Sequence, residues 1–162
     1  MAKKAIAVRL YMPEIIYDVQ NKTYLTGRSR DNGNNAESVA NMQADDEAEN
    51  ASQVMRSIGN AYAALKNVLA EYISETGTTT DNELADDSDI TVMIMMPSNY
   101  NSTANSTISA AMHQYIVNTA IADWFTITNK ADASDYLAAS VANLSQINEA
   151  IQKRVRPTKV IS

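Results

Sequence analysis

The apolar residues between positions 51 and 72 recur at alternating spacings of four and three, which is the repeat of one face of an α-helix. Asn34 or Asn35 can cap this helix, Glu37 stands where a capping box places an acidic residue, and Gly77 ends the pattern. We therefore predict one long helix over about residues 36–75, whose first half is nearly all polar. Its apolar stripe consists of Ala51, Met55, Ile58, Tyr62, Leu65, Leu69 and Tyr72.

Two later segments show the same repeat. One helix is predicted over about residues 106–126 and another over about residues 134–155, after which Pro157 prevents continuation. The stripe of the first helix consists of Ile108, Met112, Tyr115, Ile116, Ala120 and Trp124. The stripe of the second consists of Leu137, Val141, Leu144, Ile147 or Asn148, Ile151 and Val155.

Four short segments have the pattern of β-strands. Residues 5–11 alternate between two kinds of side chain, as a half-buried strand does. Residues 15–19 and 23–27 are rich in β-branched and aromatic residues, and a hairpin turn is predicted between them at residues 20–22. Residues 90–96 are β-branched and apolar on both faces, which predicts a well-buried strand.

Together these elements predict an α+β fold in which three helices pack on a small β-sheet or hairpin. The alternative is a three-helix bundle from which a β-hairpin arm stands off. A chain of 162 residues is expected to form a single domain over residues 1–162. Within it, residues 1–30 are predicted to form a basic β arm, and residues 156–162 a basic C-terminal tail.

Few residues of this chain are suited to catalysis. Cysteine is absent, His113 is the only histidine, and no phosphate-binding loop or nucleophile elbow occurs. A catalytic triad would need His113 beside both a nucleophile and a carboxylate, so a surface or boundary position is favoured for it. A single histidine without cysteine also disfavours a zinc site. We therefore expect no enzymatic activity, no cofactor and no metal centre.

Residues 81–89 hold five carboxylates, and oxygen-rich loops of this kind can bind calcium. The residue order of an EF-hand is absent, so a solvated loop is the favoured interpretation and cation binding the alternative. A carboxylate-based hydrolase that uses Asp86 or Asp87 is the least favoured hypothesis, because the partners that a nucleophile or a metal needs are missing.

The formal net charge of −6 is distributed unevenly along the chain. Residues 1–30 carry six Lys or Arg and two acidic residues, residues 31–129 carry two and fourteen, and residues 130–162 carry five and three. A chain with basic ends and an acidic middle can attract copies of itself. The eight tyrosines suit half-buried positions at protein interfaces. The interface candidates are Lys3, Lys4, Tyr11, Tyr17, Tyr24, Arg28, Arg30, Asp45, Asp46, Glu47, Glu49, Lys153, Arg154, Arg156 and Lys159.

Three stretches of the chain resemble small structural proteins of tailed bacteriophages, namely Ile15–Gly27, the long acidic helix, and the closing stretch Asp132–Pro157. The type that they resemble most is the head–tail connector, or neck adaptor, which docks as a ring on the portal. The resemblance implies a ring of copies in the virion, made in the host bacterial cytoplasm. It also implies that residues 3–30 and 154–162 reach into adjacent subunits, the portal or another neck or tail protein.

The leading hypothesis is therefore a non-enzymatic virion assembly protein that forms a homo-oligomeric ring at the head–tail junction. The alternative is a cytoplasmic binding module whose basic ends, including Arg28 and Arg30, hold an acidic or nucleic-acid partner. A sequence pI near 4.7 disfavours nucleic acid as a sequence-specific ligand. No membrane partner is expected, because no window reaches about 18 apolar residues.

Overall fold

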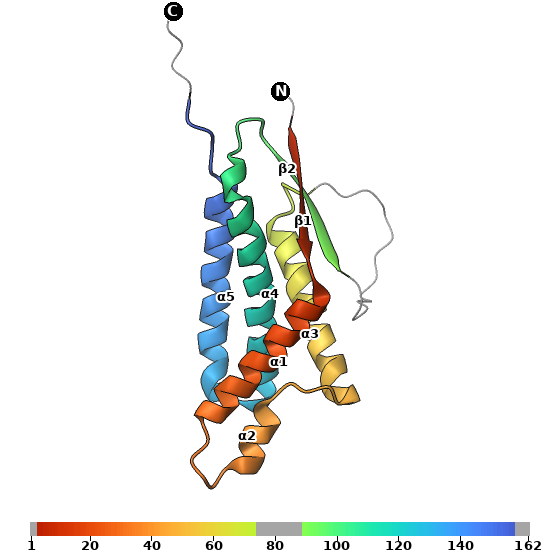
Figure 1. The fold of residues 1–162 in the computed structure, drawn as a ribbon, viewed down its shortest axis with the longest axis vertical. Helices are drawn as coiled ribbons and strands as arrows, with labels where there is room; N and C mark the ends of the chain where they lie inside the picture. The colour runs from red at the N-terminus through yellow and green to blue at the C-terminus, as the bar shows by residue number, and fades with distance from the viewer. Residues whose placement is uncertain (1–2, 74–88, 158–162) are drawn as a thin grey trace, which may run out of the picture.

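The computed structural model describes residues 3–73 and 89–157. In these stretches the long helices run side by side, and a two-stranded antiparallel sheet covers part of one side of them (Figure 1). The α+β class is confirmed, but the predicted number of three helices is wrong, because the described residues form five. The elements in chain order are β1 (Lys4–Leu10), α1 (Met12–Ser29), α2 (Ala36–Met42), α3 (Ala48–Val68), β2 (Ile90–Met96), the 3-10 turn η1 (Ser102–Ala104), α4 (Asn105–Thr128) and α5 (Lys130–Ile151).

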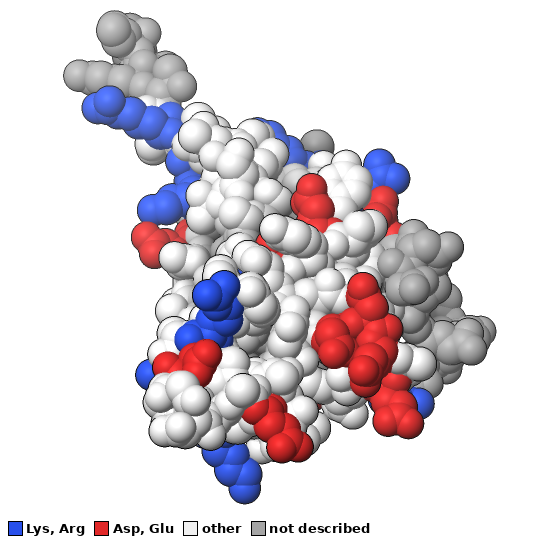
Figure 2. Space-filling view, turned by 60° about the horizontal axis from the view of Figure 1, so that its bottom comes forward, with Lys and Arg blue, Asp and Glu red and all other residues white. Residues whose placement is uncertain are grey.

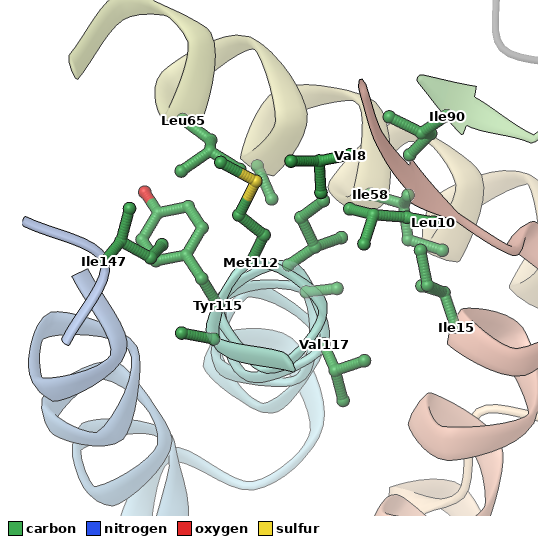
Figure 3. Close-up of a cluster of buried hydrophobic side chains, with 14 of the residues drawn as sticks. Val8, Leu10, Ile15, Ile58, Leu65, Ile90, Met112, Tyr115, Val117 and Ile147 are labelled. Carbon is green, nitrogen blue, oxygen red and sulfur yellow. The ribbon is translucent and has the colours of Figure 1, made fainter. Parts of the chain in front are cut away.

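Helix α4 lies at the centre of the fold, and its predicted bounds are confirmed to within two residues. Its predicted stripe is buried, but so are Val117, Ile121 and Phe125 on other sides of the helix. A helix that is apolar all round needs neighbours all round. Accordingly, α5, α3, α1 and β1 all contact α4. Figure 3 looks along α4 and shows Tyr115 between residues of α3 and α5, while Val117 points away from them.

The sheet joins the N-terminal strand to a strand far along the chain. Residues 90–96 form β2 as predicted, and the observed β1 differs from the predicted 5–11 by one residue at each end. The predicted burial of this strand on both faces is wrong. Buried and exposed residues alternate along β2, so only one of its faces packs on the helices, and Met93 on the other face is 40% exposed. The register pairs Ile6 with Ile94, Val8 with Val92 and Leu10 with Ile90.

The strands predicted over residues 15–19 and 23–27 are wrong, because helix α1 occupies residues 12–29. Pro13 lies in the first turn, where the missing N–H of a proline would have had no helical partner. The basic β arm predicted over residues 1–30 is therefore a strand only as far as Leu10, and no hairpin forms in its described part. The buried side of α1, at helical spacings of three and four, consists of Met12, Ile15, Val19, Thr23 and Gly27.

The long helix predicted over residues 36–75 is also wrong as a single element, because residues 43–47 separate α2 from α3. Hydrogen bonds to two side chains stabilise the non-helical segment between α2 and α3. The Thr23 hydroxyl accepts a hydrogen bond from Ala44 N at 3.0 Å. The Asp45 carboxylate accepts from Glu47 N at 3.1 Å and from Asn50 Nδ2 at 2.7 Å. Local bonds from aspartate to the backbone compete with helix hydrogen bonds, which explains why the helix restarts here.

Helix α5 begins and ends four residues earlier than the predicted 134–155. Its end is set by the segment that follows it, which pairs with the loop before α4. Asn101 N donates to Lys153 O at 3.1 Å, and Val155 N donates to Asn99 O at 2.7 Å. These bonds draw the backbone out of the helical path before Val155.

The predicted stripe of α5 is only partly the face that packs on α4. Ile147 and Ile151 are buried as predicted, whereas Leu137 and Val141 are 55% and 58% exposed. The buried side includes Ser140 instead, a small residue that lets α5 approach α4 closely. The outer side of α5 therefore presents apolar residues to solvent.

Thr23→Val tests the contact that holds the break between α2 and α3. Thr23 is fully buried, and its hydroxyl also donates to Val19 O at 2.8 Å. Valine keeps the shape and nearly the helix propensity of threonine but leaves the buried Ala44 N–H without an acceptor. We expect the free energy of unfolding, measured by urea denaturation, to fall by about 1–3 kcal/mol.

The matched control is Thr107→Val, a substitution of the same kind at an exposed position of α4. Its free energy of unfolding should lie within about 0.5 kcal/mol of the parent protein. Equal stability of the two variants would contradict the role given to Thr23.

Candidate functional site

Basic residues from both chain ends meet at one end of the molecule, where β1 begins and the segment after α5 leaves the bundle (Figure 1). Lys4 Nζ donates to Tyr100 O at 3.1 Å, and the backbone of Tyr100 pairs with that of Arg154. Tyr100 therefore joins the N-terminal and C-terminal segments. We call this group the basic end; its described members are Lys3, Lys4, Lys153, Arg154 and Arg156.

The members of the basic end differ in how they are bonded. Lys153 Nζ lies 3.6 Å from Glu149 Oε1 on the last turn of α5. The Arg154 guanidinium donates to Ile151 O at 2.8 Å and to Lys153 O at 3.0 Å. Arg156 is exposed and has no side-chain partner among residues 3–73 and 89–157. Lys159 lies outside the described residues.

Tyr100 was not among the predicted site residues, although it holds the basic end together. Its side chain is fully buried, its hydroxyl donates to Asn105 Oδ1 at 2.7 Å, and burial raises its pKa. A single aromatic residue within the polar loop 98–106 is the one sequence signal that could have indicated it.

The acidic candidates lie at the junction of α2 and α3, toward the opposite end of the molecule from the basic end (Figure 1). Asp45 is used locally to start α3, and the Asp46 carboxylate accepts from Gln20 Nε2 at 2.5 Å. Glu47 and Glu49 are exposed. In Figure 2 acidic side chains gather in a cluster on one face, while the projecting C-terminal segment carries Lys or Arg. We call residues 45–49 the acidic segment.

Arg30 was predicted to lie at an interface, but it is bonded within the chain. Its Nε donates to Asp132 Oδ2 at 2.9 Å, and a second guanidinium nitrogen contacts Asp132 Oδ1. Asn129 Nδ2 donates to the same carboxylate at 2.6 Å. The Arg30 guanidinium holds the pKa of the buried Asp132 below its ordinary value, and the carboxylate raises the pKa of Arg30. This pair ties the end of α1 to the start of α5.

Two of the tyrosine candidates, Tyr17 and Tyr24, lie on helix α1 and not on the predicted β arm. Tyr17 and Tyr24 are seven residues apart, so they share one face of α1, and they are 63% and 39% exposed. Tyr11, just before α1, is 48% exposed. The Arg28 guanidinium lies 5.7 Å from the centre of the Tyr24 ring and donates to its hydroxyl at 3.1 Å. These residues remain candidates for contact with a partner.

His113 lies at the boundary between core and solvent, with its side chain 16% exposed. Its Nε2 is 2.6 Å from Asp18 Oδ2, which links α4 to α1. Another carboxylate, that of Asp123, contacts the Ser57 hydroxyl. His113 and Asp123 are ten residues apart on α4, which is about 15 Å along a helix axis. The histidine and this serine therefore do not belong to one catalytic arrangement.

The Ser57–Asp123 contact lies in an open groove of about 530 Å³ between α3, α4 and α5. The groove is lined largely by small side chains and by the exposed Leu137, and the Thr119 hydroxyl in its wall has no hydrogen-bond partner in the structure. In the described stretches, no three His, Asp or Glu side chains are grouped as a metal ion requires. The groove offers a surface for contact.

Of the acidic loop 81–89, only Asp89 falls within the described residues. Its carboxylate lies 3.7 Å from the Arg9 guanidinium across the sheet edge. The prediction of a solvated loop over residues 81–89 otherwise falls on residues 81–88, which lie outside the described part of the chain. Among the helices that are described, none has the length and apolar character needed to cross a membrane.

Comparisons with models of protein families, with curated proteins and with solved structures gave no match to this chain.

Asp132→Asn tests the tie between α1 and α5 through its pH dependence. A carboxylate whose folded-state pKa lies below the ordinary value of 3.8 stabilises the fold above that value. This stability is lost as the pH falls through the folded-state pKa. At pH 7 we expect the variant to lose about 1–3 kcal/mol in the free energy of unfolding, and at pH 3 the difference from the parent should be smaller.

The control is Glu71→Gln, the same kind of change on an exposed carboxylate after α3 that is not among the groups acting on Arg30 or Asp132. Urea denaturation at both pH values should place it within about 0.5 kcal/mol of the parent protein. A deficit of the Asp132→Asn protein that is the same at pH 3 and pH 7 would contradict the assignment.

Proposed function

We propose that this chain is a non-enzymatic assembly protein that associates with copies of itself head to tail. The observation that carries the proposal is the separation of its charges, with the basic end and the acidic segment toward opposite ends of the long axis (Figure 1). Such a molecule meets its own complement only on a second copy. In the proposed head-to-tail arrangement the two poles of one copy meet two different neighbours, so the contact is heterologous, and a series of such contacts closes into a ring if the rotation between copies closes.

Charged residues steer two copies toward each other and align them, but burial of apolar surface is needed to keep them bound. The chain exposes apolar side chains that could supply this burial on three elements. Tyr17 and Leu25 lie on α1, Leu137 and Val141 on α5, and Val155 in the C-terminal segment. Val155 lies between Arg154 and Arg156 of the basic end, so an apolar and a charged contact can form at the same place.

The site of assembly is proposed from the resemblance to phage head–tail connectors. In that setting the copies would form a ring at the head–tail junction of a virion, and the ring would dock on the portal or on a neighbouring neck or tail protein. The Ile15–Gly27 stretch that contributes to the resemblance is part of a helix packed on α4. The reaching segments are therefore reduced to the first few residues and the residues after Lys153.

A second candidate function is a binding module for an acidic or nucleic-acid partner. The observation that favours it is the convergence of Lys4 and Arg154 on Tyr100, which gathers positive charge from both chain ends. A protein that sediments as a monomer and shifts DNA in a salt-dependent manner would support this function over self-assembly.

The test of self-assembly is the double variant Lys153→Glu/Arg156→Glu, which leaves Arg154 and its backbone bonds in place. At low ionic strength we expect its dissociation constant for self-association, measured by sedimentation velocity over a concentration series, to rise by about tenfold or more. The circular dichroism spectrum should be unchanged, because neither side chain packs in the core.

The matched control is Arg56→Glu/Lys130→Glu, which changes the net charge by the same amount at exposed positions away from the basic end. Its association should be close to that of the parent. A parent protein that is monomeric at all concentrations, or equal effects of the two double variants, would refute the proposal.

A further inference from the structure

A small apolar cavity lies between α1 and α3, directly beside the acidic segment. Its volume is about 100 Å³. A water molecule in the liquid takes up about 30 Å³, so the cavity has room for the end of one side chain and not for a folded segment. Its floor consists of Ile16, Ala51, Val54 and Met55, and its polar side of Gln20, Asp45 and Asp46.

The polar side of the cavity is negatively charged and lacks a cation. Asp45 accepts two hydrogen bonds and Asp46 accepts one from Gln20, but an ionised carboxylate can accept about four. In the part of the chain that the structure describes, no Lys or Arg forms an ion pair with either carboxylate. The exposed Glu47 and Glu49 add to the negative potential around the mouth.

An apolar floor beneath a carboxylate rim matches the shape of a lysine or arginine side chain. Both have an aliphatic stem that can lie on apolar surface and a charged end that needs an acceptor. Arginine suits the place better, because its planar guanidinium can bond two carboxylate oxygens at once.

We infer that this cavity binds the side chain of Arg156 from a second copy of the chain. The inference rests on the proposed self-assembly and names its contact. Lys153 and Arg154 already have partners within the chain, whereas Arg156 is exposed and has none among the described residues. Its neighbour Val155 is 49% exposed and can cover the rim of the cavity beside Met55.

The same contact cannot form within one copy. The segment that carries Arg156 leaves the bundle at the top of Figure 1, whereas the junction of α2 and α3, beside the cavity, lies in the lower half of the molecule. Each copy therefore offers one arginine and one cavity to other copies. If the two sites are used by two different neighbours, the series gives a closed ring or an open fibre, whereas reciprocal use by the same two copies would give a two-fold dimer.

The first test is a charge exchange between Asp46 and Arg156. Asp46 is chosen because Asp45 holds the start of α3. We expect Arg156→Glu and Asp46→Arg each to raise the dissociation constant of self-association by about tenfold. The double variant should recover most of the parent affinity, because the ion pair is restored in the opposite sense. Additive losses in the double variant would overturn the inference.

The second test fills the cavity without changing any charge. Ala51→Met places a larger side chain in the floor, and the matched control Ala63→Met makes the same substitution at an exposed position of α3. The Ala51→Met protein should lose affinity by about tenfold while the Ala63→Met protein keeps it. Equal affinities would show that the cavity is empty in the assembly, and would overturn the inference while leaving the proposed function intact.

The third test separates the cavity from the assembly. A synthetic peptide of residues 151–162, carrying a fluorophore, is titrated with the full chain, and binding is followed by fluorescence anisotropy. Binding that is lost with Ala51→Met in the protein or with Arg156→Glu in the peptide supports the cavity as the site. If the parent chain is monomeric and such binding occurs, only the proposed self-assembly fails. If the peptide does not bind, or binds equally with Arg156→Glu, the inference fails.

Discussion

The burial of α4 is the interaction on which the rest of the structure depends. Buried apolar side chains lie on all sides of α4, so α4 is covered by α5, α3, α1 and the sheet. Each of these neighbours needs only one apolar face for this contact. Their outer faces are therefore free to vary, and the exposed Tyr17 on α1 and Leu137 on α5 lie on such faces. A central apolar helix thus gives a stable body whose surface and ends can be specialised for contact.

Charged residues at both ends of the molecule bond to neighbouring elements of the same chain. The charged residues that are bonded in this way are not available to a partner. At one end Arg30 and Asp132 tie α1 to α5. At the other, Lys4 and the backbone of Arg154 are held by Tyr100. The formal charge pattern of the sequence therefore overstates the number of groups available for intermolecular pairing. Of the predicted interface residues, those that the fold does not use in this way include Arg156, Glu47 and Glu49.

The sequence predicted the elements whose apolar pattern is complete and missed those whose pattern depends on tertiary contacts. Helix α4 and strand β2 were found because nearly all of their buried residues are apolar.

Helix α1 was taken for two strands because its buried side includes Thr23 and Gly27, which a hydropathy pattern does not count. Its β-branched and aromatic residues also favour strands locally. The break after α2 depends on a hydroxyl from α1, which no local pattern shows. The basic end depends on Tyr100, for which the one local signal is a single aromatic residue in a polar loop. The candidate residues Arg156 and Asp46 could be named from the sequence, but the cavity beside Asp46 could not, because it exists only where α1 meets α3.

If the chain assembles as proposed, an apolar cavity with a charged rim would explain how it does so in one register although it has few strong interface features. Exposed charges attract one another over about 10 Å at moderate salt, and they do so without strict geometry. Many mutual arrangements of a basic end and an acidic segment are therefore similar in energy. In the proposed contact, insertion of the Arg156 side chain would select one arrangement among these, because its stem would have to lie on Ile16 and Met55 while its guanidinium meets Asp46. In the proposed assembly, charge sets the rate at which copies meet, and the fit of a single side chain sets the angle between them, which would decide whether the series of copies closes into a ring.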